Sequence, residues 1–279
     1  MKKNNKHEVQ VGPGHKAKKY LGQNFLKSVP ALSMMIEAGG VCDSDIIVEI
    51  GPGKGALTDR LLANAKQVYA IEKDSDLFAL LSLKYKDEIE KNKLILLRDD
   101  ILFFDPKKYG LKSGGYKIIA NIPYNITGAI IKRFLSETIT PCTMVLLVQK
   151  EVAERIVARD SKESILSLSV KAYGTPQYMM KVGKRFFSPA PKVDSAIIAI
   201  RDINTKQFKN KKEEELFFKI IKSGFAHKRK VLRKNLESVQ VGPGHIETMF
   251  TILDIPIMAR AEDIPYQKWL DILNYIKNT

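Results

Sequence analysis

Five short apolar runs recur along the first half of the chain, each separated from the next by enough residues for a helix. They occupy residues 45–50, 67–71, 94–97, 116–120 and 144–148. Strands joined by crossover helices form parallel sheets that are buried on both faces, so they read as continuous apolar runs. Two further runs, 178–182 and 195–201, are joined by a proline-rich bend. We therefore predict an α/β fold with a seven-stranded, Rossmann-like sheet.

The strand signals stop beyond residue 202. Residues 216–236 and 266–276 instead place apolar side chains at helical spacing. A chain of 279 residues is long enough for one large domain and one small domain. We predict a first domain over residues 1–203, in which residues 1–19 form a basic arm, and a helical domain over residues 204–279.

The net charge of +15 is concentrated in two segments. Residues 1–27 contain seven lysines and one glutamate, and residues 206–234 contain eleven lysines or arginines and three glutamates. A diffuse excess of charge favours solubility alone, whereas concentrated cations are typical of surfaces that contact phosphates. The distribution favours a nucleic-acid partner over an acidic protein or a membrane.

Several classes of protein are disfavoured by what the chain lacks. It has no run of about 18 apolar residues, the length needed for a membrane helix. Its two cysteines, Cys42 and Cys142, have no metal-type spacing, and its four histidines lie outside the apparent core. We expect a cytoplasmic protein with no membrane partner, no metal ion and no histidine-based catalysis.

A glycine-rich turn follows the first apolar run. Gly51 and Gly53 lie between that run and a predicted helix at 56–64. Glycines let the backbone approach a ligand at the carboxyl end of the first strand, where doubly wound sheets bind nucleotide cofactors. Glu72 closes the second run, where its carboxylate can accept hydrogen bonds from ribose hydroxyls. Gly51, Gly53 and Ala56 also fit the pattern G-x-G-x-x-A, so a nicotinamide or flavin oxidoreductase is an alternative.

Two acids follow the third run. In a methyltransferase, an acid at Asp99 or Asp100 would meet the exocyclic amine of the cofactor's adenine ring. Solvated loop acids are the alternative interpretation, and it applies more strongly to Asp99 than to Asp100.

The sequence Asn121-Ile122-Pro123-Tyr124 follows the fourth run and favours a methyltransferase. The N6 amine of adenine is a weak nucleophile because its lone pair is delocalised into the ring. The Asn121 side-chain oxygen and the Ile122 carbonyl could accept the two amine hydrogens and aim the lone pair, without a strong base. Pro123 stiffens the loop, and Tyr124 offers a ring for a flipped or single-stranded base. An ordinary turn is the alternative.

These motifs together resemble the ribosomal RNA adenine dimethyltransferases of the KsgA (RsmA) type, within the class I methyltransferases. The resemblance covers residues 18–276. It rests on residues 21–26 (LGQNFL), 49–53 (EIGPG), 121–126 (NIPYNI), 149–152 (QKEV) and 187–195 (FSPAPKVDS). One departure is Ile165-Leu166, where the family has Tyr-Gly.

The resemblance implies a fold, a cofactor and a substrate. The last strand of the sheet would be antiparallel, the methyl donor would be S-adenosyl-L-methionine, and Tyr124 and Phe187 would sandwich the target adenine. The substrate would be two adjacent adenosines in the 3′-terminal hairpin loop of 16S rRNA, each dimethylated by a monomeric enzyme during biogenesis of the small ribosomal subunit. The cofactor contacts would be Asn24, Leu26, Gly51, Gly53, Glu72, Asp100 and Asn121.

The C-terminal region distinguishes this type from related enzymes. Macrolide-resistance methyltransferases, which modify adenine in 23S rRNA, share the first half of the chain. Residues 226–236 resemble the basic helix of the KsgA type, although basic helix faces are often merely solvated. The expected RNA contacts are Lys228, Arg229, Lys230, Arg233 and Lys234. A non-catalytic RNA-binding assembly factor is a further alternative, and the identical segments 9–15 and 239–245 (VQVGPGH) receive no role.

Overall fold

A computed structural model describes residues 17–227, 229–237 and 245–279 of the chain. Lys228, residues 9–15 and all of the second repeat except His245 therefore lie outside the described residues. The strands are β1 (Phe25–Leu26), β2 (Ile46–Ile50), β3 (Gln67–Glu72), β4 (Leu94–Arg98), β5 (Lys117–Asn121), β6 (Thr143–Gln149), β7 (Thr175–Val182), β8 (Phe187–Ser188) and β9 (Ser195–Arg201).

Within the described residues, seven strands form one sheet in the order β4-β3-β2-β5-β6-β9-β7. The first five of these run parallel to one another, and β9 is antiparallel to both of its neighbours. The predicted seven-stranded sheet and its antiparallel last strand are confirmed. The two remaining strands, β1 and β8, pair with each other in a separate antiparallel ribbon.

Successive residues of the central strands point to opposite faces of the sheet, so each strand contributes to two hydrophobic cores. Ile47 and Val145 pack with helices on one face, and Val48 and Leu146 pack with helices on the other. The first face is covered by α1 (Val29–Ala38), α2 (Ala56–Asn64) and α3 (Ser75–Lys84), and the second by α5 (Thr127–Ser136), α6 (Lys150–Val157) and α7 (Ile165–Lys171). Burial on both faces explains why the central residues of these strands are apolar, with Glu49 of β2 as an exception.

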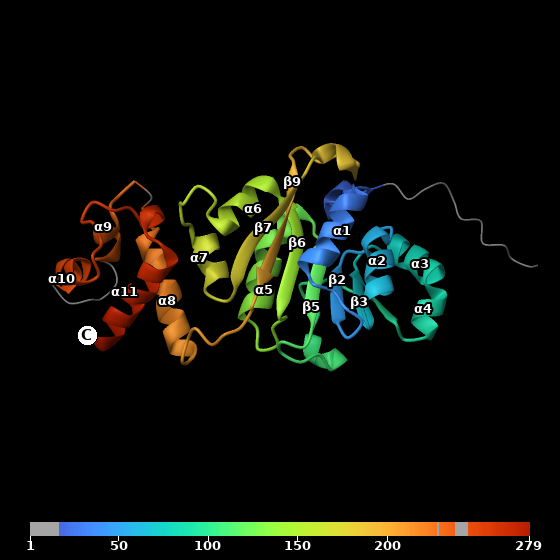
Figure 1. The fold of residues 1–279 in the computed structure, drawn as a ribbon, viewed down its shortest axis with the longest axis horizontal. Coiled ribbons are helices and arrows are strands. Elements are labelled where there is room, and N and C mark those ends of the chain that lie inside the picture. Colours follow the sequence, from blue (N-terminus) through green and yellow to red (C-terminus); the bar gives the residue numbers. More distant parts are fainter. Residues whose placement is uncertain (1–16, 228, 238–244) are drawn as a thin grey trace, which may run out of the picture.

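The chain after β9 is helical wherever the structure describes regular elements. Figure 1 shows α8 to α11 at one end of the molecule, beyond α7, and α2 to α4 at the other. One hydrophobic cluster continues from the sheet into these helices and includes Phe217 and Trp269. The domain boundary near residue 203 remains a proposal.

The remaining helices are α4 (Lys86–Glu90), α8 (Lys211–Gly224), α9 (Leu232–Leu236), α10 (His245–Ile252), α11 (Tyr266–Asn278) and the 3-10 turns η1 (Lys19–Leu21), η2 (Pro106–Tyr109), η3 (Tyr124–Ile126), η4 (Lys184–Phe186) and η5 (Ala261–Asp263).

The predicted basic helix over residues 226–236 is confirmed only over residues 232–236 and is wrong before them. Helix α8 ends at Gly224, and α9 begins only at Leu232. The Asn235 side chain donates hydrogen bonds to the carbonyls of Gly224 and His227, at 2.6 and 3.2 Å. These carbonyls are therefore satisfied by a side chain, and residues 225–227 and 229–230 between the helices form turns and bends.

Candidate active site

A cavity of about 620 Å³ lies at the carboxyl ends of β2, β3 and β5, and beside the loop after β4. Strand β2 lies between β3 and β5, so the chain order reverses at this point. Parallel sheets bind ligands at such a switch point because the loops of neighbouring strands diverge there. Gly51, Glu72, Asp100 and Asn121 all line the cavity.

The glycine turn presents its backbone to this cavity. Gly51 and Gly53 have φ angles of 62° and 61°, a region that side chains other than glycine rarely adopt. A Cβ atom on Gly51 would meet no atom within 4 Å, whereas one on Gly53 would lie 3.0 Å from the Phe25 ring. The turn therefore forms an open cradle at Gly51.

Glu72 connects the glycine turn to the end of β3. Its carboxylate accepts hydrogen bonds from the backbone N–H groups of Gly53, at 3.1 Å, and Asp74, at 2.8 Å. Burial raises the pKa of Glu72, and these backbone donors act in the opposite direction. The side chain is only 5% exposed, yet it lines the cavity. A carboxylate has about four acceptor positions, so both oxygens can still accept from a diol.

Asp100 lies in the loop after β4, where hydrogen bonds hold its carboxylate in place. Its carboxylate accepts from Lys73 Nζ at 2.8 Å and from the Leu102 backbone N–H at 2.9 Å. Burial acts to raise the pKa of Asp100, but these two donors together with the positive charges of Lys73 and Arg133 hold the pKa below its ordinary value. Asp99 also lines the cavity, is exposed, and accepts from the Asp100 backbone N–H at 2.7 Å.

Asn121 closes β5 with its side-chain amide in a defined orientation. The amide nitrogen donates to the Asn24 carbonyl at 3.0 Å, and Asn24 in turn donates to the Gly22 carbonyl at 3.1 Å. Among the described residues, Asn121 Oδ1 accepts no hydrogen bond. This oxygen is therefore available as an acceptor.

The residues after Asn121 place an aromatic ring at the cavity. Ile122 is buried, Pro123 precedes η3 with a φ of −60°, and Tyr124 begins η3. The Tyr124 hydroxyl lies 2.5 Å from the hydroxyl of Ser195, which is fully buried at the start of β9. Burial raises the pKa of Tyr124, and the hydrogen bond with Ser195 acts against this shift.

Phe187 is not brought to the cavity beside Tyr124. It lies on β8 opposite Leu26 of β1, is 4% exposed, and packs in the hydrophobic core. Leu26 and Ser188, its neighbours in this ribbon, line the cavity in its place. The structure therefore does not contain the expected sandwich of Tyr124 and Phe187.

The sequence analysis did not predict the ion pairs and the hydrogen bond that hold the N-terminal segment across the cavity. Lys18 Nζ contacts Asp74 at 2.6 Å and Asp76 at 2.8 Å, and the Gln23 side chain donates to Asp74 at 2.7 Å. Residues 20–27, which line the cavity, are thereby tied to the end of β3. Lys18 and Asp74 are 56 positions apart, so no local pattern reveals their contact.

Glu49 is a second missed residue. It lines the cavity, is fully buried, and accepts a hydrogen bond from the Thr58 hydroxyl at 2.7 Å. Burial raises its pKa to about 8. An acid inside an otherwise apolar strand was the available signal in the sequence.

The expected RNA contacts lie away from this cavity. Arg229, Lys230 and Lys234 are exposed, whereas Arg233 is partly buried and forms an ion pair with Glu247 at 2.5 Å. Lys228 is outside the described residues. The described part of the chain contains neither a group of acids, histidines and cysteines suited to a metal ion nor a helix with the length and apolarity to cross a membrane.

Comparison with known proteins gives consistent matches over nearly the whole chain. The family model described as ribosomal RNA adenine dimethylase matches residues 14–278. The ribosomal RNA small subunit methyltransferase A of Fusobacterium nucleatum is 38% identical over 260 residues, which cover 92% of this chain and 97% of that protein. The protein of the same name from Nostoc is 37% identical over 273 residues, 93% and 97% of the two chains.

Two solved structures share the fold. A dimethyladenosine transferase from Plasmodium falciparum superposes with a TM-score of 0.76 and 25% identity, covering 91% of this chain and 98% of that one. The 23S rRNA methyltransferase ErmE superposes with a TM-score of 0.77 and 22% identity, covering 91% and 100%.

Proposed function

We propose a substrate and a mechanism for this chain from one premise: it belongs to the ribosomal RNA adenine dimethylase family. It is thus an rRNA adenine methyltransferase. The substrate that we propose is 16S rRNA in the small ribosomal subunit or its precursor, at two adjacent adenosines of the 3′-terminal hairpin loop. Relatives named for the small subunit, at 37 to 38% identity, support this choice over the 23S substrate of ErmE. A monomeric state and cytoplasmic action are part of the proposal.

The cofactor cavity fits S-adenosyl-L-methionine, which supplies a methyl group on a positively charged sulfur. The open cradle at Gly51 leaves room for a ligand beside the backbone. The Glu72 carboxylate would accept hydrogen bonds from the ribose hydroxyls, and Asp100 would accept one from the adenine amine. Gly53, Asn24 and Leu26 would complete the walls. A dinucleotide oxidoreductase has no support from the family match.

In the proposed mechanism, the chain orients the target amine and does not deprotonate it. The single observation that carries it is the orientation of Asn121: its amide nitrogen is occupied by the Asn24 carbonyl, so its oxygen can accept from the target. The Ile122 carbonyl would accept the second amine hydrogen. The two acceptors localise the lone pair and aim it into the cavity.

Tyr124 provides the stacking surface for the base. The Ser195 hydroxyl holds its phenol, so the ring presents one orientation to the cavity. Because Phe187 is buried in the core, we assign it a supporting role, packing the β1–β8 ribbon that carries Leu26.

The proposal is tested by methyl transfer to small subunits from cells that lack this protein. We expect labelled methyl groups on two adjacent adenines, and a rate at least about 100-fold lower for Asn121→Ala, by analogy with the loss of one hydrogen-bonding group at a reacting centre. Asn64→Ala, which alters an exposed asparagine at the end of α2, should stay within about twofold of wild type.

Transfer that is unaffected by Asn121→Ala would contradict the mechanism. Wild-type protein that binds small subunits in a salt-sensitive way without transferring methyl groups would favour the non-catalytic assembly factor.

A further inference from the structure

A second cavity, of about 240 Å³, lies between the helices beside the sheet and the C-terminal helices. One wall contains Arg155 of α6 and Ile165 of α7, and the other contains Phe225, His227 and Lys230 from the turns after α8. It shares no lining residue with the cofactor cavity. The active-site mechanism gives it no role.

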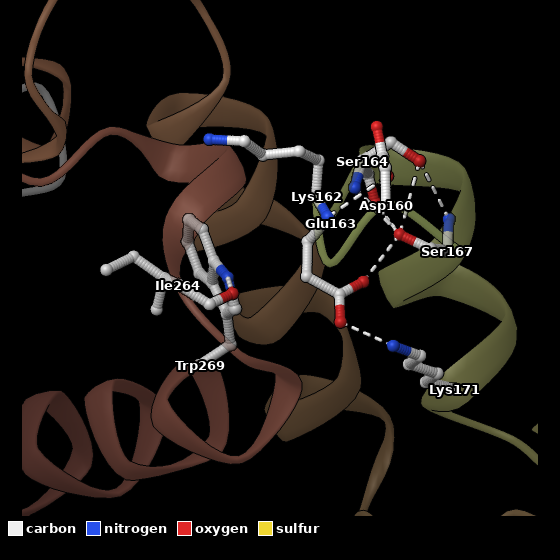
Figure 2. Close-up of polar contacts among 8 residues, drawn as sticks. All are labelled: Asp160, Lys162, Glu163, Ser164, Ser167, Lys171, Ile264 and Trp269. Carbon is white, nitrogen blue, oxygen red and sulfur yellow. Dashed lines mark hydrogen bonds and ion pairs between the residues drawn. The ribbon is translucent and has the colours of Figure 1, made fainter. Parts of the chain in front are cut away.

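The two walls of this cavity are held together by direct bonds. The Glu163 backbone N–H donates to the Glu262 carbonyl at 2.8 Å, and the Lys162 ammonium forms an ion pair with Asp263. Figure 2 shows Glu163 with its carboxylate directed at Ser167 and Lys171, which it joins by a hydrogen bond and an ion pair. The cavity therefore has a preset shape.

Part of the cavity wall is apolar. Ile165 is 41% exposed, so part of its aliphatic side chain is accessible to a ligand in the cavity. Phe225 is partly buried and stacks on Trp269, with ring centroids 5.6 Å apart. A nucleobase gains from apolar and aromatic contact whatever its identity, because every base has a π-face.

The cations that line this cavity differ from the neighbouring cations in whether they form ion pairs. Lys162 and Lys171 are both paired with carboxylates. In contrast, the Arg155 guanidinium and the Lys230 ammonium are exposed and form no ion pair within the described residues. The two acids in the lining are near lysines: Glu163 is paired with Lys171, and Glu262 lies 3.8 Å from Lys162. The cavity thus offers positive charge to a ligand.

We infer that this cavity binds an unpaired nucleotide of the rRNA, away from the methylated adenosines. The base would contact Ile165 and Phe225, and the phosphate would contact Arg155 and Lys230. Helix α6 begins at Lys150, directly after β6, at the same edge of the sheet as Asn121. Arg155 is five residues further along α6, which is about 8 Å at the helical rise of about 1.5 Å per residue. A nucleotide held here would set the register of the RNA. This inference rests on the proposed rRNA substrate.

Photocrosslinking tests whether RNA occupies the cavity. A photoreactive benzophenone amino acid replaces Ile165, or Leu83 on α3 as the control, which is 65% exposed and lies outside both cavities. Each variant is irradiated with small subunits from cells that lack the protein. We expect a crosslink from position 165 to an rRNA nucleotide other than the methylated pair, and none from position 83. Methyl transfer without a crosslink at 165 would overturn the inference.

Kinetics provide an independent test. Arg155→Ala and Ile165→Ser should each raise the KM for small subunits roughly five- to tenfold, as expected for one lost phosphate or base contact. Arg155→Lys should restore most of the affinity, and Lys132→Ala, an exposed cation of α5, should have less than a twofold effect. KM values for Arg155→Ala and Ile165→Ser that equal the Lys132→Ala value would contradict the inference.

Two further outcomes would distinguish a failure of the proposed methyl transfer from a failure of the assignment of this cavity to RNA. A crosslink at position 165 without methyl transfer by the wild-type protein would support the cavity and reject the proposed chemistry. Micromolar binding of adenosine monophosphate that Arg155→Ala abolishes would instead assign the cavity to free nucleotides, and would overturn its assignment to RNA.

Discussion

At the scale of single residues, the candidate active site depends on partners far away in the sequence. Asn121 is oriented by Asn24, and Tyr124 is held by Ser195. These side chains are therefore set by the fold as well as by their own motif. The Ser195 hydroxyl can be removed by substitution without changing Tyr124, whereas the group that contacts Asn121 is the backbone carbonyl of Asn24.

Ser195→Ala should lower kcat about fivefold. The substitution removes a hydrogen bond of about 1 kcal/mol and leaves the Tyr124 ring less constrained. Tyr124→Phe should have a similar effect, and the double variant should be little worse than either single one. The check is a double-mutant cycle on kcat with small subunits. Fully additive losses would mean that Ser195 does not act through Tyr124.

Glu49→Gln should remove a pH dependence of stability. The pKa of Glu49 is raised in the folded protein, so folding favours its neutral form. That contribution is complete below the unfolded pKa of about 4.5 and is lost as the pH rises to about 8. We expect wild type to lose a few kcal/mol between pH 5 and pH 9 from this group. Urea unfolding of the cofactor-free protein measures it, and parallel curves for wild type and Glu49→Gln would contradict the assignment.

At the scale of secondary-structure elements, the end of α8 decides where the basic residues lie. Gly224 packs directly beneath Trp269 of α11 and Leu232 of α9. These helices approach closely at Gly224, and the Asn235 side chain donates to carbonyls at and after the end of α8, so α8 does not extend to Arg229 and Lys230. Arg229 and Lys230 therefore lie on a turn beside the second cavity.

Gly224→Ala should destabilise the protein by about 1 to 3 kcal/mol. The added Cβ would lie 2.4 Å from Trp269 Cη2 and 2.9 Å from Leu232 Cδ1, so the core must shift. Gly128→Ala in α5 is the matched control, since its Cβ would meet nothing within 4 Å, and alanine favours helix by up to about 1 kcal/mol. Thermal or urea unfolding compares them, and equal stabilities of the two variants would reject the packing argument.

At the scale of the whole molecule, the cofactor cavity and the basic segment 206–234 lie in different parts of the chain. The cofactor cavity lies at the sheet edge, while the segment 206–234 carries a large share of the positive charge. The second cavity lies where these parts meet. Affinity for RNA should therefore be separable from affinity for the cofactor.

Neutralising Lys228, Arg229 and Lys230 together should weaken binding to small subunits and reduce its dependence on salt. Each lost phosphate contact lowers the slope of log K against log salt concentration by roughly 0.7 to 0.9. Cofactor affinity, measured by calorimetry, should stay unchanged. Lys107→Ala with Lys132→Ala provides a control of exposed cations outside the segment 206–234. An equal loss of cofactor binding would show that the basic turn is structural.

Much of the fold could be predicted from the sequence because its signals are local. A strand buried on both faces must be apolar, so the strands of the sheet were recognisable, and the glycine turn, Glu72 and Asn121 could be placed at one edge from strand ends alone. The helical end of the chain was also evident, although the break after Gly224 was not.

What only the tertiary structure decided depends on contacts between distant segments. The partners of Asn121, Tyr124 and Asp74 lie 97, 71 and 56 positions away. The burial of Phe187 follows from the pairing of β8 with β1. The second cavity exists only because α6 and α7 pack against the turns after α8. Local patterns report which face of an element is apolar, but not which distant group will meet it, because that is settled by packing the whole chain at once.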